Sequence, residues 1–511
     1  MTNLLTKEQA RQLDYYSMKV MGIPGIQLMG NAGNKVANSA RKLVSNLHNP
    51  SIFIICGKGN NGGDGFATAL KLNEWGFQIH VHSIPDALEI KGDASQYFEL
   101  CNEKDIFITY GLEIPTIENP DLIIDAILGT GIQLPIRSEL FSIIEWINQV
   151  NSQVLSVDIP SGLDGNNGQV DPMAVDANET ITMGYQKVGM TLSEGPSKCG
   201  NIVVADIGFP SLKNVQLEGR LWTLFDEKNA YHLLKPPHRN TYKHRQGKVL
   251  ILAGSIGMTG AAILSTMAAM RTGAGLTITC APASLNAVYE KHILEGMTLS
   301  LDDDGKGYFT LKHYAKIKEK IEWADAVIIG PGLGSHPDTI DLVSQILKES
   351  TKPIILDADG LRCFHKNAFS LNEINTPIIV TPHLGELSQL LNKDLKLIQE
   401  NLMVYADEWM KKYTGIAVIK SVPATTFCRN KAIMNISGHS GLASAGTGDV
   451  LSGMIGSFVA QGLSHEDAAQ LGVFIHGKTA DSLLSKKGYR GLLASDLLDE
   501  IPNTIKVYEV V

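Results

Sequence analysis

Asp449 follows a run of small residues and glycines, Ala443–Gly448, and precedes an apolar run, Val450–Ala460. This pattern predicts a tight turn that opens a helix, where backbone N–H groups lack internal partners and the helix dipole is positive. Such turns bind anions, phosphate above all. Because phosphate repels a carboxylate, Asp449 makes chemical sense as a base that deprotonates a hydroxyl attacking phosphorus. The alternative is structural, since an Asp that caps a helix stabilises it by about 1 kcal/mol.

A second glycine-rich segment, Gly57–Gly65, follows a predicted buried strand, 51–56, and precedes a predicted helix, 66–75. Strand, glycine loop and helix form the outline of a phosphate or dinucleotide site. The segment matches neither the G-x-G-x-x-G pattern nor the Walker motif. Its asparagines, Asn60 and Asn61, add side-chain carbonyls that could bind a monovalent cation or a ribose.

Three aspartates, Asp64, Asp125 and Asp158, lie near glycines at or just beyond the ends of predicted strands. In an open parallel sheet, ligands bind beyond the carboxyl ends of the strands. Each aspartate alone could instead cap a helix or form a turn. Their recurrence at equivalent places favours a shared site.

Both halves of the chain alternate predicted strands and helices, which indicates the α/β class with two doubly wound parallel sheets. A capping box, Thr6–Gln9, opens a helix to about Met21, and a second helix runs through Ser45. A proline-rich polar segment, Lys235–Asn240, interrupts the pattern. We therefore predict one domain at 1–215, a linker at 216–240 and a second domain at 241–511. The predicted strands are 51–56, 78–82, 121–127, 154–159, 179–183, 201–207, 248–253, 276–280, 326–329, 353–357, 377–380, 417–420, 425–428 and 432–434.

Composition excludes several classes of protein. A net charge of −9 over 511 residues argues against nucleic acid and anionic membranes as partners. No apolar run approaches the length of a membrane span, and the polar N-terminus resembles no signal peptide. The six cysteines are scattered without a CxxC pair, which predicts reduced thiols in the cytoplasm.

The motifs, taken together, resemble two enzyme families. Gly57–Gly65 with Val157–Gly162 is similar to the NAD(P)H-hydrate epimerases, which implies a Rossmann-like N-terminal domain. The C-terminal half resembles the ribokinase-like NAD(P)H-hydrate dehydratases in four segments: Gly254–Ala262, Gly330–Gly334, Thr381–Glu386 and Gly446–Asp449. In this order they resemble the bifunctional nicotinamide-nucleotide repair enzymes of prokaryotes. The substrates implied are NADH and NADPH hydrated at carbon 6 of the nicotinamide ring.

The resemblance implies that the C-terminal domain phosphorylates the hydroxyl of the S hydrate and eliminates it, with Asp449 as the base. The phosphoryl donor expected is ADP, as in prokaryotic relatives, with ATP as the alternative, and Mg2+ should bridge its phosphates. The nucleotide loop departs from the usual Lys-Gly-x-x-Thr at Ser421 and Ala424, where Thr425 could substitute. Nucleotide contacts are implied for Lys420, Ser421, Val422, Pro423, Ala424, Gly446, Thr447 and Gly448, and substrate contacts for Ala261, Ala262, Gly332, His383 and Asp449.

For the N-terminal domain, the resemblance implies epimerisation of the R and S hydrates, with Asp158 as acid and base. A potassium ion (K+) would bind Asn61, Asp125 and Ser161, an all-oxygen set. Lys187 is predicted to be a surface lysine, with assistance to Asp158 as the alternative. Gly30 replaces the acid that usually precedes Asn-Ala-Gly. Substrate contacts are implied for Asn60, Asn61, Gly62, Gly63, Asp64, Gly129, Thr130, Gly131, Ile132, Gln133, Leu134, Pro135 and Asp158.

An alternative function is a ribokinase-type small-molecule kinase fused to a non-catalytic Rossmann-like binding domain. The epimerase-like residues of the N-terminal half and the Pro-His-Leu-Gly-Glu setting of His383 argue against it. In either case we expect a homo-oligomer that binds small molecules.

Overall fold

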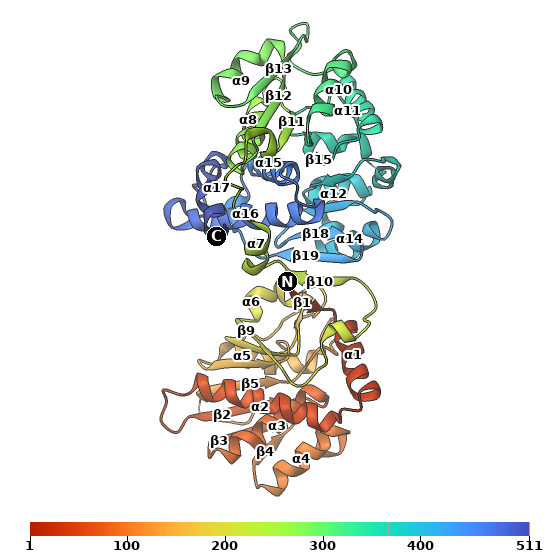
Figure 1. Cartoon of the computed structure of the whole chain (residues 1–511). Helices are drawn as coiled ribbons and strands as arrows, with labels where there is room; N and C mark the ends of the chain where they lie inside the picture. The colour runs from red at the N-terminus through yellow and green to blue at the C-terminus, as the bar shows by residue number, and fades with distance from the viewer. Residues whose placement is uncertain (118, 366, 510–511) are drawn as a thin grey trace. The chain divides into compact units, whose positions relative to one another are not determined.

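The computed structural model describes residues 1–117, 119–365 and 367–509 (Figure 1). The chain divides into two compact units, one formed by Asn3–Trp222 and the other by Met1–Thr2 with Thr223–Val511. Among the described residues, no helix has the length and apolarity needed to cross a bilayer.

The first unit is built on a sheet with the strand order β4-β3-β2-β5-β6-β7-β9, in which every neighbouring pair is parallel. The short strands β1 and β8 lie outside this sheet and pair with each other in parallel. The strands are β1 (Thr2–Leu5), β2 (Ser51–Cys56), β3 (Gln78–Ser83), β4 (Phe107–Tyr110), β5 (Leu122–Ala126), β6 (Gln153–Val157), β7 (Glu179–Met183), β8 (Gln186–Lys187) and β9 (Asn201–Ala205). The helices are α1 (Lys7–Tyr15), α2 (Gly25–Leu43), α3 (Asn60–Glu74), α4 (Asp93–Glu103), α5 (Phe141–Gln149) and α6 (Gly195–Lys198), with a π-helical turn at Tyr16–Val20.

Helices cover both faces of this sheet, as a doubly wound fold requires. Alternate residues of β2 point to opposite faces. Ile52 and Ile54 pack in a core with α2 and α3, whereas Phe53 and Ile55 pack with Ile143 and its neighbours on α5. The buried apolar run of β2 follows from this two-sided burial.

The second unit has the strand order β13-β12-β11-β14-β15-β16-β17-β18-β19. Its pairs are parallel up to β17, and β17, β18 and β19 are antiparallel. The strands are β11 (Lys248–Leu252), β12 (Leu276–Pro282), β13 (Met297–Leu301), β14 (Ala326–Ile329), β15 (Ile354–Leu356), β16 (Ile378–Val380), β17 (Ile416–Ile419), β18 (Ala424–Cys428) and β19 (Lys431–Asn435).

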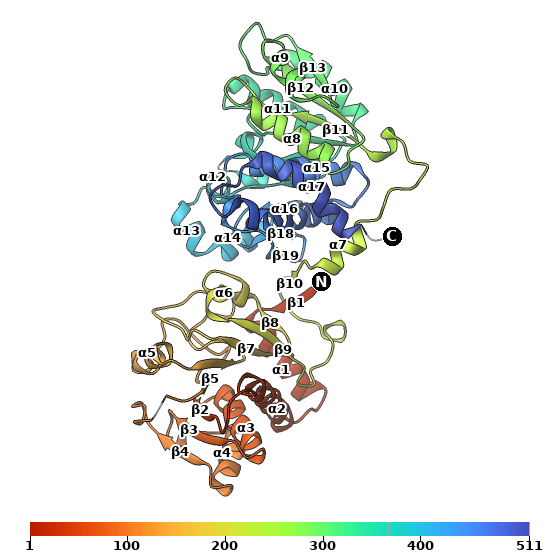
Figure 2. The ribbon, with the colours of Figure 1, turned by 90° about the vertical axis from the view of Figure 1, so that its left-hand side faces the viewer.

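Helices α8, α15 and α17, far apart in the sequence, lie side by side against this sheet (Figure 1, Figure 2). The helices of the unit are α7 (Glu227–Leu233), α8 (Thr259–Arg271), α9 (Asn286–His292), α10 (Tyr314–Trp323), α11 (Pro337–Glu349), α12 (Leu384–Leu391), α13 (Leu395–Glu400), α14 (Leu402–Met410), α15 (Thr447–Ala460), α16 (His465–Lys487) and α17 (Ala494–Tyr508).

The α/β class and the parallel sheets are confirmed, as is the capping box at Thr6. Several local expectations were wrong. The helix predicted to about Met21 has the expected extent, but its part after Tyr15, Tyr16–Val20, is π-helical and not α-helical. The range 216–240 holds strand β10 (Leu221–Leu224) and helix α7. Strands β4 and β13 were missed, since partly exposed edge strands carry a weaker apolar signal than buried ones.

Candidate active sites

Asp158 lies directly after β6, at the carboxyl edge of the first sheet. Its φ is +65°, a left-handed conformation that is costly for a residue with a side chain. The Met183 N–H donates to Asp158 Oδ1 at 3.0 Å, and the Asp158 side chain forms an ion pair with Lys187. These contacts offset the backbone strain and hold the carboxylate at a defined position beyond the sheet.

Lys187 is buried, with only 2% of its residue surface exposed, so the prediction of a surface lysine was wrong. Its ammonium group also donates to Thr182 Oγ1 at 2.9 Å and to the Met183 carbonyl at 3.4 Å. A lysine this deep needs a counter-charge. Asp158 supplies this counter-charge. The sequence alone could not pair the two residues, because 28 residues separate them in the chain.

A pocket of about 850 Å³ opens in front of this pair. The sequence predicted a loop over Gly57–Gly65, but helix α3 begins at Asn60, so Asn60–Asp64 forms its first turns. Gly62 packs against Gly57, because a Cβ at Gly62 would lie 1.8 Å from the Gly57 carbonyl oxygen. Gly63 packs against Met29 and Ala94. The predicted residues that line the pocket are Asn60, Asn61, Asp64, Gly129, Thr130, Gly131, Ile132, Gln133, Pro135 and Asp158, whereas Gly62, Gly63 and Leu134 do not line it.

Asn61, Asp125 and Ser161 come together behind the pocket, around the backbone of Leu128. Asp125 is fully buried and accepts hydrogen bonds from the Ser161 hydroxyl at 2.5 Å, the Ser161 N–H at 2.9 Å and the Ser156 hydroxyl at 2.8 Å. The Asn61 amide donates to the Leu128 carbonyl at 3.1 Å. Burial raises the pKa of Asp125, and these hydrogen bonds oppose the shift.

Sequence reasoning missed Asp14, which lines the same pocket from helix α1. Burial, and then the negative charge of Asp158, raises the pKa of Asp14 to about 6. The same two causes, in the same order, raise the pKa of Asp64 well above its ordinary value. The place of Asp14 on α1 gave no sequence signal, because the pocket is lined by segments that are far apart in the chain.

In the second unit, helix α15 begins at Thr447, with Gly446 as its N-cap at φ +88°. Asp449 is therefore the third residue of the helix, and the alternative of an Asp N-cap is excluded. Burial, and then the charge of Asp357, raises the pKa of Asp449 to about 7. A Cβ at Gly448 would lie 3.4 Å from Lys420 Nζ, so the glycine turn and this ammonium group are neighbours.

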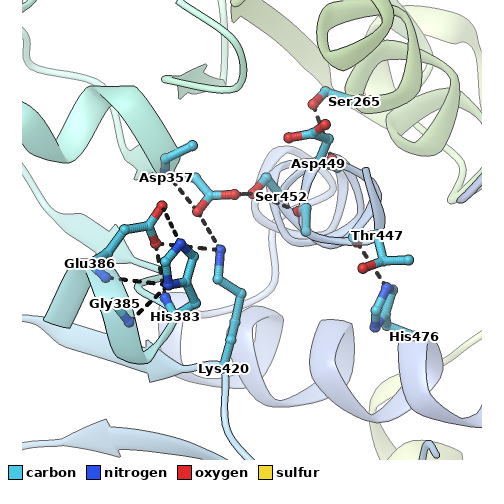
Figure 3. Close-up of polar contacts among 12 residues, drawn as sticks. Ser265, Asp357, His383, Gly385, Glu386, Lys420, Thr447, Asp449, Ser452 and His476 are labelled. Atoms are coloured by element: carbon cyan, nitrogen blue, oxygen red, sulfur yellow. Dashed lines mark hydrogen bonds and ion pairs between the residues drawn. The ribbon is translucent and has the colours of Figure 1, made fainter. Parts of the chain in front are cut away.

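Asp357, Lys420 and Ser452 form a buried polar cluster beneath the turn (Figure 3). Lys420 Nζ lies 2.7 Å from Asp357 Oδ1, and Ser452 Oγ donates to Asp357 Oδ2 at 2.6 Å. The exposed fractions of the Lys420 and Asp357 side chains are 20% and 1%. Asp357 follows β15 as Asp158 follows β6, so the same strand-end rule could have identified it.

His383 and Glu386 adjoin this cluster at the N-terminus of α12 (Figure 3). His383 Nδ1 accepts from the Gly385 N–H at 3.0 Å, and the His383 N–H donates to Glu386 Oε2 at 2.9 Å. Glu386 Oε2 lies 3.9 Å from Lys420 Nζ. Burial raises the pKa of Glu386 to about 7, with Lys420 opposing the shift. His383 thus caps the helix and still exposes 57% of its side chain.

The remaining predicted residues of this unit differ in exposure. A Cβ at Gly332 would lie 2.9 Å from the Ala261 Cβ, so these two residues are neighbours, whereas Ala262 is buried in the core. In the segment Lys420–Ala424, Val422 is 94% exposed and the Ser421 hydroxyl donates to the Pro423 carbonyl at 2.8 Å. The expected substitute, Thr425, is fully buried beneath this segment.

Comparisons with known proteins cover both units. The family described as NAD(P)H-hydrate dehydratase matches residues 249–503, and the family described as YjeF-related protein N-terminus matches residues 25–189. A bifunctional NAD(P)H-hydrate repair enzyme of Moorella thermoacetica is 32% identical over 99% of this chain and 97% of its own length. The corresponding protein of Escherichia coli is 30% identical over 95% and 90%.

Solved structures resemble the second unit. An ADP/ATP-dependent NAD(P)H-hydrate dehydratase of Bacillus subtilis, crystallised with ATP and Mg2+, is 27% identical, with a TM-score of 0.50 over 56% of this chain and 99% of that one. A ribokinase-like protein of Enterococcus faecalis has the same TM-score at 24% identity, which confirms the ribokinase-like fold. Since both halves match in this order and the relatives match nearly end to end, the chain belongs to the family of bifunctional NAD(P)H-hydrate repair enzymes.

Proposed function

We propose that this chain repairs hydrated NADH and NADPH, with epimerisation of the R and S hydrates in the first unit and nucleotide-dependent dehydration of the S hydrate in the second. The observation that carries the proposal is the near end-to-end match to bifunctional repair enzymes. It is supported by an acid directly after β6, Asp158, and an acid in the first turn of α15, Asp449. We assign the epimerase domain to 1–215 and the dehydratase domain to 241–511.

In the dehydratase, Asp449 takes the proton of the carbon-6 hydroxyl as that oxygen attacks the terminal phosphorus of ADP or ATP. A pKa near 7 suits this role, since the group is a stronger base than an ordinary carboxylate and is still substantially ionised at neutral pH. The N–H groups at the start of α15 and the ammonium group of Lys420 would stabilise negative charge on the phosphates. Departure of the phosphorylated oxygen and loss of a ring proton restore the dihydropyridine.

In the epimerase, Asp158 would donate a proton to the departing hydroxyl and recover it from the returning water. Lys187 would hold the Asp158 side chain in place. The pocket in front of the pair, at about 850 Å³, is within the range of small-molecule and cofactor sites.

The residues at both sites fit the expected ions. Asp125, Ser161, Asn61 and the Leu128 carbonyl supply only oxygen ligands for K+, with one carboxylate among neutral groups, and K+ would fix the loop after β5. Among the described residues no cluster of three or more His, Cys, Asp or Glu side chains is arranged as a metal site. Mg2+ would accordingly bind chiefly to phosphates and water, with Glu386 or Asp449 nearby, and would neutralise phosphate charge.

All six cysteines are free, which supports our assignment of the chain to the cytoplasm. The homo-oligomer stays a prediction.

The experiment supplies purified protein with the separated R and S hydrates, Mg2+, and ADP or ATP in turn. We expect restored absorbance of the reduced nicotinamide and release of phosphate from both hydrates. A stable phosphorylated product without restored absorbance would instead establish the kinase alternative. Asp158→Asn should block use of the R hydrate alone, and Asp449→Asn should block use of both.

A further inference from the structure

The N-terminal segment of the chain forms one wall of the epimerase pocket. Strand β1 pairs with β8 so that Leu5 lies opposite Lys187, the lysine bound to Asp158. Helix α1 follows at once and is tied to the loop after β6 by the ion pair of Lys7 with Asp164, at 2.6 Å. The helix therefore has a fixed position relative to Asp158.

One face of this wall points into the pocket. Ala10, Asp14 and Met18 line it at spacings of four residues, and Asp14 is the ionisable member of the three. Asp14 is partly buried, and its carboxyl shares the pocket with those of Asp64 and Asp158. Three carboxyl groups thus reach the same pocket from α1, from α3 and from the end of β6.

The pocket contains one buried cation for these three carboxyls. Lys187 is committed to Asp158, and the other cations that line the pocket, Arg11, Lys58 and Arg137, are exposed. Ionising two carboxyls that share a pocket without a cation is energetically unfavourable, so at least one of them keeps its proton. This shortage of positive charge goes with raised pKa values for both remaining carboxyls, chiefly through burial, and the pKa of Asp14 is about 6.

Epimerisation through loss and return of the hydroxyl requires two proton transfers. A carboxylic acid gives its proton to the carbon-6 hydroxyl, which leaves as water while the lone pair of the ring nitrogen forms a C=N bond. A water molecule then adds to carbon 6 from the other face and gives its proton to a carboxylate. The substrate and its epimer differ only in configuration, so one proton is given up and one is taken. With two groups the proton has moved from one carboxyl to the other, and the reverse conversion or exchange with water restores the starting state. Since departure and return occur on opposite faces, two acid–base groups on different elements serve better than one.

We propose that Asp14 is a second catalytic acid–base group of the epimerase, paired with Asp158 so that each exchanges protons with the hydroxyl on one face of the ring. The proposal rests on the proposed epimerase function. The other ionisable groups that line the pocket are Arg11, Lys58, Asp64, Glu89, Asp93, Arg137, Glu139 and Lys187.

The test compares Asp14→Asn and Asp14→Glu with a control on the same helix, Glu8→Gln, whose side chain lies outside the pocket and accepts from Asn166. Interconversion of the pure R and S hydrates is measured across pH 5 to 8 without nucleotide. Dehydration of the S hydrate by the same sample reports on the integrity of the protein, and thermal unfolding reports on the first unit.

We expect Asp14→Asn to slow interconversion by about 10²-fold and to remove the pH dependence near pH 6, while dehydration and the unfolding temperature stay as in the wild type. Asp14→Glu should restore part of the rate, and Glu8→Gln should match the wild type. An Asp14→Asn rate within twofold of the wild type would overturn the proposal, as would an Asp14→Glu variant that folds normally but is no faster than Asp14→Asn. A wild-type protein that interconverts nothing would overturn the epimerase function itself.

Discussion

Replacing Lys420 by methionine removes the ammonium group between Asp357 and Glu386. At an effective dielectric constant of about 20, a charge pair at 2.7 Å attracts by about 6 kcal/mol, before the cost of desolvation is subtracted. Breaking a buried pair costs about 3–5 kcal/mol in practice. We expect the lower end, about 3 kcal/mol, because Asp357 keeps its hydrogen bonds from Ser452 and from the Ala358 N–H at 2.8 Å.

The assay is thermal unfolding followed by calorimetry, in which the two units can be distinguished. A loss of about 3 kcal/mol should lower the transition of the second unit by about 6–9 °C. The control is Lys312→Met, which removes an ion pair of similar length, 2.6 Å to Asp304, at an exposed position of the same unit. The control should change the transition little, since exposed pairs are weakly stabilising.

A double variant separates the pair from the individual side chains. Lys420→Met combined with Asp357→Asn removes both charges of the 2.7 Å pair, so it should recover about 2 kcal/mol relative to the sum of the single changes. If Lys420→Met proves no more destabilising than the Lys312→Met control, or if the double variant shows strict additivity, the cluster does not stabilise the unit as argued.

Three further outcomes follow from the structure. Because Asp449 must be ionised to act as the base, kcat/KM for dehydration should rise with pH through about 7, and a profile flat from pH 6 to 8 would exclude that role. A Cβ at Gly30 would lie 2.3 Å from the Tyr97 hydroxyl. Gly30→Ala should therefore stabilise the first unit by about 1 kcal/mol in a Tyr97→Phe background, and by less, or not at all, in the wild type. Equal effects on urea unfolding in the two backgrounds would contradict this. Burial lowers the pKa of His476 to about 4. As the pH falls below 6.5, the unfolded chain therefore binds a proton before the folded protein does, and up to about 3 kcal/mol of folding stability is lost by pH 4. His476→Gln should remove this pH dependence of stability in urea titrations.

The positions of Asp158 and Asp449 could be predicted because they depend on local rules. An acid after a buried strand or at the glycine-rich start of a helix lies at the carboxyl edge of a parallel sheet wherever the chain forms one. Asp357 obeys the same rule, yet a sequence with many strand-end aspartates does not show which of them meets a cation. That depends on the pairing of β15, β16 and β17, which brings Lys420 beside Asp357.

Lys187 and Asp14 could not be predicted for a related reason. A lysine in a short polar turn is usually solvated. Its burial here depends on β1, almost the whole unit away in sequence, which pairs with β8 beside it. The same pairing fixes the helix that carries Asp14. Contacts between residues this far apart in the chain leave no periodicity or spacing in the sequence.

Because β1 pairs with β8, the recovery of epimerase activity reports on the folding of the first unit. Leu5 and Lys187 are far apart in the chain, so we expect their pairing to be among the last contacts to form when the unit folds. Epimerase activity recovered after dilution from denaturant should therefore appear in the last kinetic phase, later than the recovery of helical circular dichroism. A colorimetric measurement of turnover would then show when β1 pairs with β8 during folding.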